Sequence, residues 1–229
     1  MEQSVLSDWN DIRQTTFLER IVIGYEGVKN QWSTAPAEYT AKTLTICGHP
    51  VMEDWEDEYM KLLAKIVTNN GGHILEIGFG MGISATYIQS HFISKHTIIE
   101  ANQDVFTEAK SWSVKSKVPV ELLLGFWEDQ TSKLSDNSFD GILFDTYPLT
   151  ETEIHKNHFF FFKEAYRLLK PGGILTYYSD EISNFSPEHH ALLKAAGFSS
   201  INKVICPVAP PPDCQYWKSA TILAPIVTK

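Results

Sequence analysis

The stretch "HILEIGFGMGIS" (residues 73–84) decides the fold of this chain. It opens with a short apolar run, ends that run at a glycine, and places two further glycines at every second position after it. An amphipathic segment, "GISATYIQSHF" (82–92), begins at the last of them. Glycine lets a backbone turn tightly and approach a ligand closely, and a helix N-terminus offers unpaired N–H groups. The stretch therefore predicts a buried strand, a ligand-binding turn and a helix.

Apolar and amphipathic segments alternate along much of the chain, which is typical of strands separated by covering helices. The further strands expected in this alternation are "HTIIEA" (96–101), "PVELLLG" (119–125), "FDGILFD" (139–145) and "GGILTYY" (172–178). The further helices expected between them are "NQDVFTEAKSWSVK" (102–115) and "KNHFFFFKEAYRLLK" (156–170). The alternation predicts a doubly wound α/β sheet, mostly parallel, with ligands beyond the carboxyl ends of its strands.

The two ends of the chain depart from this alternation. In the tail, "SINKVICPVAP" (200–210) and "YWKSATILAPIVTK" (216–229) are expected to pair antiparallel at one edge of the sheet. Residues 1–70 hold a Pro/Ala-rich loop and an expected helix, "EDWEDEYMKLLAKIVTNN" (53–70). We therefore expect two parts, an N-terminal region at 1–70 and one compact domain at 71–229.

The composition favours a small-molecule ligand. The chain has 229 residues, a net charge of -9 and a hydrophobic fraction of 43%. It can bury a core, while its negative charge gives no help in binding nucleic acid or anionic lipid. No window approaches the roughly eighteen apolar residues of a membrane span, and no signal-peptide core is visible, so a cytoplasmic location is expected. Three scattered cysteines, Cys47, Cys206 and Cys214, predict neither disulfides nor a metal site.

Polar and aromatic residues at successive strand ends predict a nucleoside pocket. Glu76 lies inside the first strand, and Glu100 closes the next, where a carboxylate can accept both hydroxyls of a ribose. "GFWED" follows the third strand and offers Trp127 as a stacking face and Glu128 as an acceptor for an adenine amine. Because the glycine spacing is not G-x-G-x-x-G and no Lys or Arg lies in these loops, NAD is the second choice of cofactor. A purely structural turn stays open.

Asp145 and Glu56 are the candidate acids of a reaction site. Asp145 ends a strand that is expected to be buried, so its charge needs a cation or a hydrogen-bond donor. A role for Asp145 as the cap of a helix near Thr150 stays open. On a helix, Glu56 would share a face with Met52 and Met60 at four-residue spacing. Two sheltered carboxylates without an obvious basic counterpart imply a cationic substrate.

Several segments resemble known families. "LEIGFGMG", "IIEAN", "GFWED" and "RLLKPGGILTYY" resemble the motifs of class I S-adenosylmethionine-dependent methyltransferases, over residues 70–180. "QWSTAPAEY", "GHPVMEDWEDEYM", "FDGILFDTYPL" and "DCQYW" narrow the resemblance to the guanidinoacetate N-methyltransferases. The resemblance implies a Rossmann-like methyltransferase sheet, S-adenosylmethionine as cofactor and a small guanidino substrate. It also implies that residues 1–70 form a lid over the site.

The resemblance assigns residues to roles. Asp145 and Glu56 correspond to guanidino-binding carboxylates. The implied cofactor contacts are Trp32, Met52, Met60, Glu76, Gly78, Phe79, Gly80, Met81, Gly82, Ile83, Ser84, Glu100, Ala101, Asn102, Trp127, Glu128 and Asp145. The implied acceptor contacts are Trp32, Met52, Glu56, Asp145, Asp180 and Glu181. A guanidinium presents planar N–H donors to carboxylates and attacks poorly while protonated. We therefore expect Asp145 to accept a proton while Glu56 holds the opposite edge.

The stretch after "LTYY" departs from the family pattern. Where the family supplies small polar residues and backbone donors for the acceptor's carboxylate, this chain has Asp180 and Glu181. Either these acids point to solvent, or the acceptor lacks a simple carboxylate and carries an amine or hydroxyl. Guanidinoacetate or a close analogue is the expected acceptor. Arginine, another guanidino-containing specialised metabolite and a protein arginine side chain stay open.

Other functions and features carry less weight. A methyltransferase for an amine or phenol and a catalytically silent binding module are the rival functions. His155 and His158 are one helical turn apart and are expected to pack in a helix rather than bind metal. The oligomeric state stays open, with a homodimer among the options.

Overall fold

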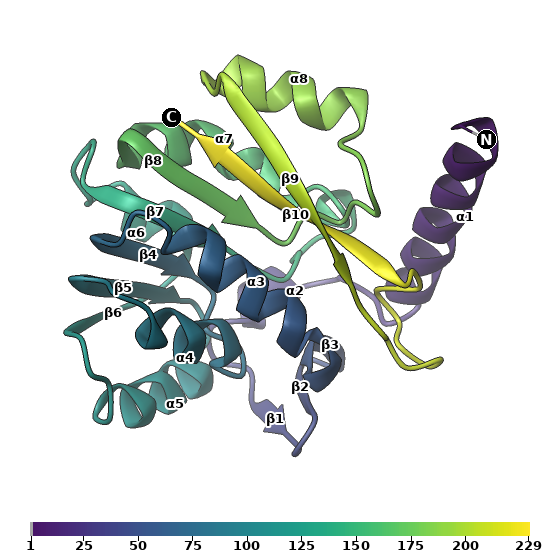
Figure 1. Cartoon of the computed structure of the whole chain (residues 1–229). Helices are drawn as coiled ribbons and strands as arrows, with labels where there is room; N and C mark the ends of the chain where they lie inside the picture. Colours follow the sequence, from purple (N-terminus) through teal and green to yellow (C-terminus); the bar gives the residue numbers. More distant parts are fainter. Residues whose placement is uncertain (1) are drawn as a thin grey trace.

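A mixed β-sheet forms the centre of the molecule (Figure 1). The computed structural model describes the backbone of residues 2–229 and the side chains of residues 10–229. Within these residues the large sheet has seven strands, in the order β6 (Val120–Leu124), β5 (Lys95–Glu100), β4 (His73–Ile77), β7 (Phe139–Phe144), β8 (Leu169–Tyr177), β10 (Thr221–Thr228) and β9 (Ser200–Pro207). Strands β6 to β8 in this order are parallel, and β10 runs antiparallel to both of its neighbours. The predicted α/β sheet with an antiparallel C-terminal edge is confirmed.

The strand order reverses in the middle of the sheet. The chain begins the sheet at β4, moves outward to β5 and β6, and then crosses back to place β7 on the other side of β4. In doubly wound sheets, connections leave in opposite directions at such a point and open a crevice at the carboxyl ends of the strands. The sequence prediction that ligands lie at this edge therefore points to the ends of β4 and β7.

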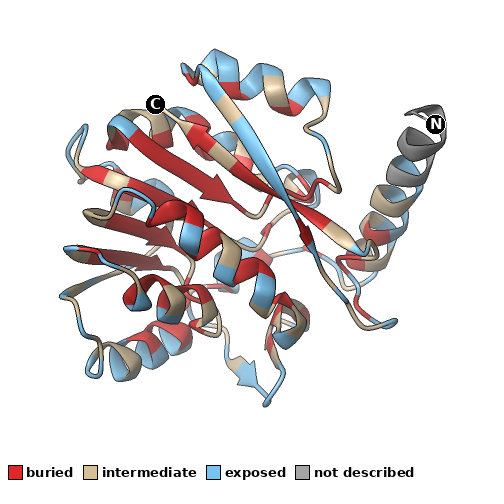
Figure 2. Ribbon diagram, in the orientation of Figure 1, coloured by how far each residue is buried: buried red, intermediate tan, exposed pale blue. Residues whose placement is uncertain are grey.

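Helices cover both faces of the sheet, and buried residues concentrate along its strands (Figure 2). These helices are α3 (Asp57–Val67), α4 (Ile83–Ser90), α5 (Gln103–Ser113), α6 (Trp127–Thr131), α7 (Phe162–Leu168) and α8 (Pro187–Ala196). One core cluster joins Ile74 and Ile98 to α3, α4 and α5. The other joins Leu75 and Ile99 to α7 and α8. Because successive strand side chains point to opposite faces, the unbroken apolar runs supply both cores.

Two predicted helices are shorter than expected. The helix expected at 156–170 is divided into a 3-10 turn, η3 (Asn157–Phe161), and α7, and β8 already begins at Leu169. The helix expected at 53–70 begins as a 3-10 turn, η1 (Asp54–Glu56), and continues as α3. A reciprocal capping box between Glu53 and Glu56 starts this turn. The proposed helical face shared by Met52 and Glu56 is therefore wrong, because Met52 lies before the helix.

The N-terminal region contains structure that sequence patterns did not predict. It holds α1 (Glu2–Ile21), α2 (Val28–Gln31) and a small antiparallel sheet of β1 (Ala37–Tyr39), β2 (Thr43–Ile46) and β3 (His49–Glu53). Strands of three to five residues are too short to show a clear alternation in sequence.

The N-terminal region is fastened to the carboxyl edge of the large sheet. Asn102, at the end of β5, donates hydrogen bonds to the carbonyl oxygens of Trp32 (2.7 Å) and Ala35 (2.8 Å). Helix α3, by contrast, packs on the sheet with α4. The predicted division at residue 70 stays a prediction. None of the described helices combines the length and apolar content that a membrane crossing requires.

Candidate active site

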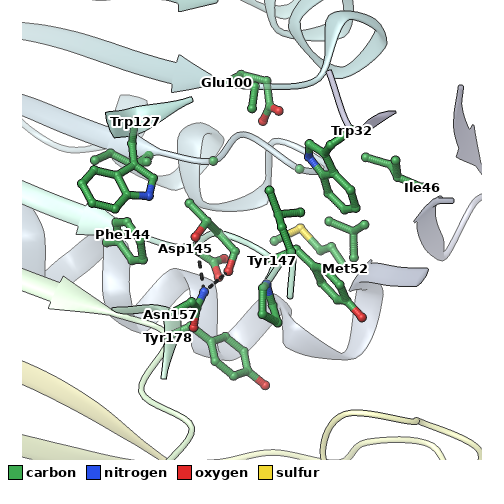
Figure 3. A pocket seen from close by; sticks show the side chains of 18 of the residues that line it. Trp32, Ile46, Met52, Glu100, Trp127, Phe144, Asp145, Tyr147, Asn157 and Tyr178 are labelled. Atoms are coloured by element: carbon green, nitrogen blue, oxygen red, sulfur yellow. Dashed lines mark hydrogen bonds between the residues drawn. The ribbon is translucent and has the colours of Figure 1, made fainter. Parts of the chain in front are cut away.

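A cavity of about 380 Å³ lies at the carboxyl edge of the large sheet, beneath the N-terminal region (Figure 3). The loops that follow β4, β5, β6, β7 and β8 all contribute to its wall. The N-terminal region closes it with Arg20, Trp32 and Met52, and the C-terminal segment adds Tyr216. The cavity therefore occupies the crevice that the reversal of strand order creates.

The first wall is the glycine loop after β4, which lies against the end of β7. A Cβ atom at Gly78 would stand 2.0 Å from the backbone oxygen of Asp145, and the φ angle of Gly78 is 92°. Only glycine adopts this conformation without strain and leaves this space. The contact brings the glycine loop and Asp145 together on the cavity wall.

Glu100 presents a fixed carboxylate to the cavity. Its two oxygens accept the backbone N–H groups of Phe79 (2.9 Å) and Asn102 (2.8 Å). Burial raises the pKa of Glu100, and these backbone hydrogen bonds favour its charged form. Each carboxylate oxygen has a second lone pair, so the side chain can still accept hydroxyl donors from a ligand.

Aromatic residues frame the same end of the cavity. Figure 3 shows Glu100 between Trp127 and Trp32, with Tyr178 toward the opposite end. Edge-on contacts with Phe144 and Phe161, at centroid distances of 6.0 and 5.2 Å, fix the Trp127 ring. This end can therefore hold a flat base beside a ribose, as the sequence predicts.

Not every residue that the resemblance implied reaches the cavity. The implied cofactor contacts on the wall are Trp32, Met52, Gly78, Phe79, Gly80, Glu100, Ala101, Trp127, Glu128 and Asp145. Those outside the wall are Met60, Glu76, Met81, Gly82, Ile83, Ser84 and Asn102. Glu76 accepts a hydrogen bond from Ser84 and lies 2.9 Å from His96, so its charge is used inside the protein. The cofactor contacts of both groups stay predictions.

Glu56 is the more buried of the two candidate acids on the wall. Its side chain is 2% exposed, and one oxygen accepts both the Tyr216 hydroxyl (2.6 Å) and the Glu53 backbone N–H (2.9 Å). Burial raises the pKa of Glu56 to about 8, and the charge of Asp145 adds to this. The second oxygen accepts no hydrogen bond from the described residues.

Asp145 lies on the same wall. Its backbone N–H donates to Ile77 (2.9 Å), while its carboxylate accepts no hydrogen bond from the described part of the chain. Burial raises the pKa of Asp145 to about 7, and the charges of Glu76 and Asp180 add to this. The carboxylate does not cap a helix near Thr150, because the turn that begins there has no side-chain cap. Asp145 is thus available to a ligand.

Several wall residues escaped the sequence analysis. Asn157 holds the loop after Asp145 by donating to the backbone oxygen (2.5 Å) and hydroxyl (3.3 Å) of Thr146, as the dashed lines in Figure 3 mark. Tyr216 falls inside the quoted motif "DCQYW", which could have suggested it. Arg20 lies in α1 and gave no sequence signal.

Asp180 and Glu181 are both buried, so of the two alternatives left open by the sequence, the one in which they point to solvent is wrong. Asp180 is 6% exposed, lines the cavity and has its Oδ1 3.0 Å from His155 Nδ1. Glu181 is fully buried, lies outside the wall and faces His189 (3.2 Å) and Arg13 (3.4 Å). Only Asp180 is therefore placed to contact an acceptor. The predicted acceptor role of Glu181 stays a prediction without a cavity contact.

His155 and His158 do not form a helical pair. His155 has a φ of 63° and lies before η3, so the prediction that both pack in one helix is wrong. Within the described residues, no three His, Cys, Asp or Glu side chains gather as a metal-binding group.

Sequence comparison identifies the family. A profile described as guanidinoacetate N-methyltransferase matches residues 20–229, which is nearly the whole chain. The chain belongs to the guanidinoacetate N-methyltransferase family. This confirms the resemblance and places the chain among the class I S-adenosylmethionine-dependent methyltransferases, so the predicted cofactor is also confirmed.

Curated relatives of this guanidinoacetate N-methyltransferase family member are longer proteins. Protein arginine N-methyltransferase 2 of Yarrowia lipolytica is 35% identical over 147 residues, covering 60% of this chain and 30% of the relative. The protein of the same name from Saccharomyces cerevisiae is 34% identical over 137 residues, which cover 56% of this chain and 32% of the relative. The chain thus matches about a third of the length of these relatives.

Solved structures share the fold of this family member. Spermidine synthase from Thermotoga maritima has a TM-score of 0.58 at 16% identity, over 84% of this chain and 72% of that one. A spermidine synthase in complex with the transition-state analogue AdoDATO has a TM-score of 0.56 at 16% identity. The match covers 81% of this chain and 64% of that one. These likenesses support the Rossmann-like methyltransferase fold.

The residues present fit S-adenosylmethionine. The buried Glu100 keeps acceptor capacity for the ribose hydroxyls, and Trp127 offers a flat apolar face. The loops after β4, β5 and β6 carry no Lys or Arg that would suit a pyrophosphate.

Proposed function

We propose that the chain methylates a guanidino nitrogen of a small acceptor, guanidinoacetate or a close analogue. N-methylation of arginine or of another guanidino-containing specialised metabolite is the second candidate. The observation that carries the proposal is the placement of Glu56 and Asp145 on one cavity wall, each with an oxygen that accepts no hydrogen bond from the described residues.

Two acids on the wall of one cavity favour a cationic ligand. Burial and the charge of Asp145 raise the pKa of Glu56 to about 8, while burial and the charges of Glu76 and Asp180 raise the pKa of Asp145 to about 7. A cation between them would favour both charged forms, because buried charges are stable only when they are paired. A guanidinium suits the pair because its planar N–H groups can meet one carboxylate at each edge.

The same acids can prepare the acceptor for attack. A free guanidinium has a pKa of about 12.5 to 13.8, and its nitrogen is a poor nucleophile while it carries the proton. In the proposal Asp145 accepts that proton and Glu56 holds the opposite edge of the group. When bound, S-adenosylmethionine supplies an electrophilic methyl group on a positively charged sulfur. That positive charge would also favour the ionised form of Asp145.

The remaining wall divides between the two ligands. In the proposal Glu100 binds the ribose and Trp127 stacks on the adenine. The glycine loop lets the protein backbone approach the cofactor closely. Residues of the N-terminal region cover the site as a lid. Support comes from the stacking of Trp32 on Tyr147 at a centroid distance of 5.6 Å, which joins that region to the loop after β7.

The second candidate has an observation of its own. Asp180 is buried on the wall, where it would repel the carboxylate of guanidinoacetate unless a cation intervened. The position of Asp180 favours an acceptor with a positively charged group besides its guanidinium. The longer relatives are named protein arginine N-methyltransferase 2, which supports an arginine side chain as the methylated group.

One assay tests the proposed function. Release of S-adenosylhomocysteine is measured with guanidino compounds and with matched amines and phenols. Turnover of at least one guanidino compound, together with none of the amines or phenols, is expected. Turnover of an amine or phenol alone would overturn the proposal, and binding of cofactor without turnover of any compound would favour the silent binding module.

A further inference from the structure

Two opposite charges on the cavity wall are not used by the proposed reaction. Arg20 comes from the last turn of α1, and Asp180 follows β8, so the residues are far apart in the chain. Both line the same cavity. The two residues are 4% and 6% exposed, so neither is a solvated surface charge.

The Arg20 guanidinium is a buried cation with capacity for a further partner. Its Cζ atom lies 5.0 Å from the centre of the Tyr147 ring, and its Nε is buried without a hydrogen-bond partner. No ion pair within 4.0 Å is found for it among the described residues, Asp180 included. Asp180 acts on Arg20 electrostatically from beyond ion-pair distance, so the guanidinium still lacks the close anion that a buried charge favours.

Asp180 is fixed on the wall by its own contacts. It has a φ of 52°, its backbone oxygen accepts a hydrogen bond from Arg13 (3.2 Å), and its Oδ1 faces His155 (3.0 Å). Burial opposes its charge, but His155 and Arg20 outweigh burial and hold the pKa of Asp180 below its usual range. Asp180 is therefore an anion on the wall, and its Oδ2 accepts no hydrogen bond from the described residues.

Asp180 belongs to the same half of the cavity as the reaction site. Its charge raises the pKa of Asp145. The charges of Glu56 and Asp180 both raise the pKa of Tyr178, which lines the cavity. The Tyr178 hydroxyl is itself buried without a partner. A ligand held by Glu56 and Asp145 thus has Asp180 and an unused hydroxyl nearby.

We infer that the acceptor is a guanidino α-amino acid whose carboxylate binds Arg20 and whose ammonium group binds Asp180. This inference rests on the proposed function, since it takes the guanidinium to lie between Glu56 and Asp145. It narrows the acceptor from any guanidino compound to one with a zwitterionic head, as in free arginine or a close homologue.

Charge matching separates this acceptor from simpler ones. A guanidino amino acid has a group for each of four charged side chains on the wall: the guanidinium for Glu56 and Asp145, the ammonium for Asp180 and the carboxylate for Arg20. Guanidinoacetate would leave Asp180 opposite no cation, and a guanidino amine would leave Arg20 opposite no anion. Each mismatch loses one charge-assisted hydrogen bond between the ligand and the wall.

The same match excludes an arginine within a peptide chain. Its amino and carboxyl groups are amides, so neither Arg20 nor Asp180 would meet an opposite charge. Recognition of a protein substrate is therefore an outcome of the test rather than part of the inference.

The first experiment uses the wild-type chain and a matched panel of acceptors. The panel is L-arginine, 5-guanidinopentanoate, which lacks the amine, agmatine, which lacks the carboxylate, guanidinoacetate and N-acetylarginine amide. S-adenosylhomocysteine release gives kcat/KM, and calorimetry with S-adenosylhomocysteine present gives acceptor affinity. L-arginine is expected to exceed each compound that lacks one head group by at least about tenfold, the worth of one charged hydrogen bond.

The second experiment assigns the two head groups to residues. Arg20→Gln should lower kcat/KM for L-arginine by at least about tenfold. The same variant should leave kcat/KM for agmatine within about threefold of the wild type. Asp180→Asn should lower kcat/KM for L-arginine by the same factor and leave kcat/KM for 5-guanidinopentanoate within about threefold. The exposed Lys65→Gln and Asp11→Asn change the same charges elsewhere and should not alter the ranking. Arg20→Lys should recover part of the lost activity, which a purely structural role would not predict.

The outcomes separate this inference from the proposed function. If guanidinoacetate or N-acetylarginine amide is the best acceptor, the inference is overturned and the proposed function stands. If no guanidino compound is turned over or bound, both fall. If a variant does not fold, the calorimetric comparison of L-arginine with 5-guanidinopentanoate on the wild-type chain decides, and equal affinities would overturn the inference.

Discussion

The Tyr216 hydroxyl donates a hydrogen bond of 2.6 Å to the Glu56 carboxylate, across 160 residues of chain. The same oxygen also accepts the Glu53 backbone N–H, so the two donors fix one edge of the carboxylate. The other oxygen is then left to a ligand in the cavity. The C-terminal segment thereby determines how Glu56 faces an acceptor.

Tyr216→Phe is expected to raise KM for the acceptor by about tenfold at neutral pH, with a smaller effect on kcat. Loss of a hydrogen bond to a charged group costs about 1.5–3 kcal/mol, and part of it is regained by rotation of Glu56. Steady-state kinetics measures KM, with Tyr166→Phe as the control. Tyr166 lies outside the cavity wall and packs on Phe198 at a ring-centroid distance of 5.2 Å. An unchanged KM in Tyr216→Phe would show that the tyrosine does not orient Glu56.

Asp145→Asn should leave the affinity for S-adenosylhomocysteine within about threefold and lower kcat by about 10²–10⁴-fold, the usual contribution of a general base. The amide keeps the size of the side chain but cannot accept the proton. Calorimetry and single-turnover rates measure the two quantities separately. Turnover close to that of the wild type would exclude Asp145 as the proton acceptor.

Glu100→Gln is expected to weaken S-adenosylhomocysteine binding by about 10-fold or more, because the amide cannot accept hydrogen bonds at both positions. One of the backbone N–H groups of Phe79 and Asn102 would face an NH₂ group instead of an oxygen. Calorimetry measures the affinity. Glu121→Gln is the matched control, because it removes the charge of an exposed glutamate in β6. Equal affinities in the two variants would contradict the role of Glu100.

Gly78→Ala should destabilise the chain by about 3 kcal/mol or more, since a Cβ there combines backbone strain with a clash. Gly172→Ala is the matched control. Its φ of 80° is close to the 92° of Gly78, but a Cβ at Gly172 meets nothing within 4 Å. Urea denaturation should show a loss of only about 1 kcal/mol in the control, from strain alone. Equal losses in both variants would mean that the contact with Asp145 does not restrict residue 78.

The contribution of Glu56 and Asp145 to the stability of the ligand-free chain is expected to fall as pH rises from 5 to 8. Histidines with lowered pKa values, His49, His73, His158 and His189, act in the opposite direction, so the comparison with a variant isolates the acids. Burial raises the pKa of Glu56 to about 8 and that of Asp145 to about 7, so the folded state binds protons that the unfolded chain has released. Stability from these groups is full below the unfolded pKa and falls until the folded pKa is passed. The depressed pKa of Asp180 acts only below this range.

Urea denaturation at several pH values measures this loss, which should be on the order of a few kcal/mol. Glu56→Gln removes one of the two raised acids and should flatten the profile. A bound guanidino acceptor should also flatten it, because a cation favours both charged carboxylates. A wild-type profile that runs parallel to that of Glu56→Gln would contradict the raised pKa of Glu56.

Local sequence determined the sheet and most of its edge residues. Apolar runs gave the strands, and a glycine loop before a helix marked the ligand edge, because both depend on neighbours along the chain. Glu100, Trp127 and Asp145 could be predicted as site residues since they follow strands of a parallel sheet, whose carboxyl ends must meet.

Tertiary structure alone decided what surrounds these residues. Nothing near Arg20 in the sequence indicates a cavity, and its burial there follows from the docking of α1. Asp180 and Glu181 are adjacent, yet the positive φ of Asp180 directs one to the cavity and the other to His189. Which of two neighbouring acids meets a ligand depends on contacts far away in the chain, and no local pattern records them.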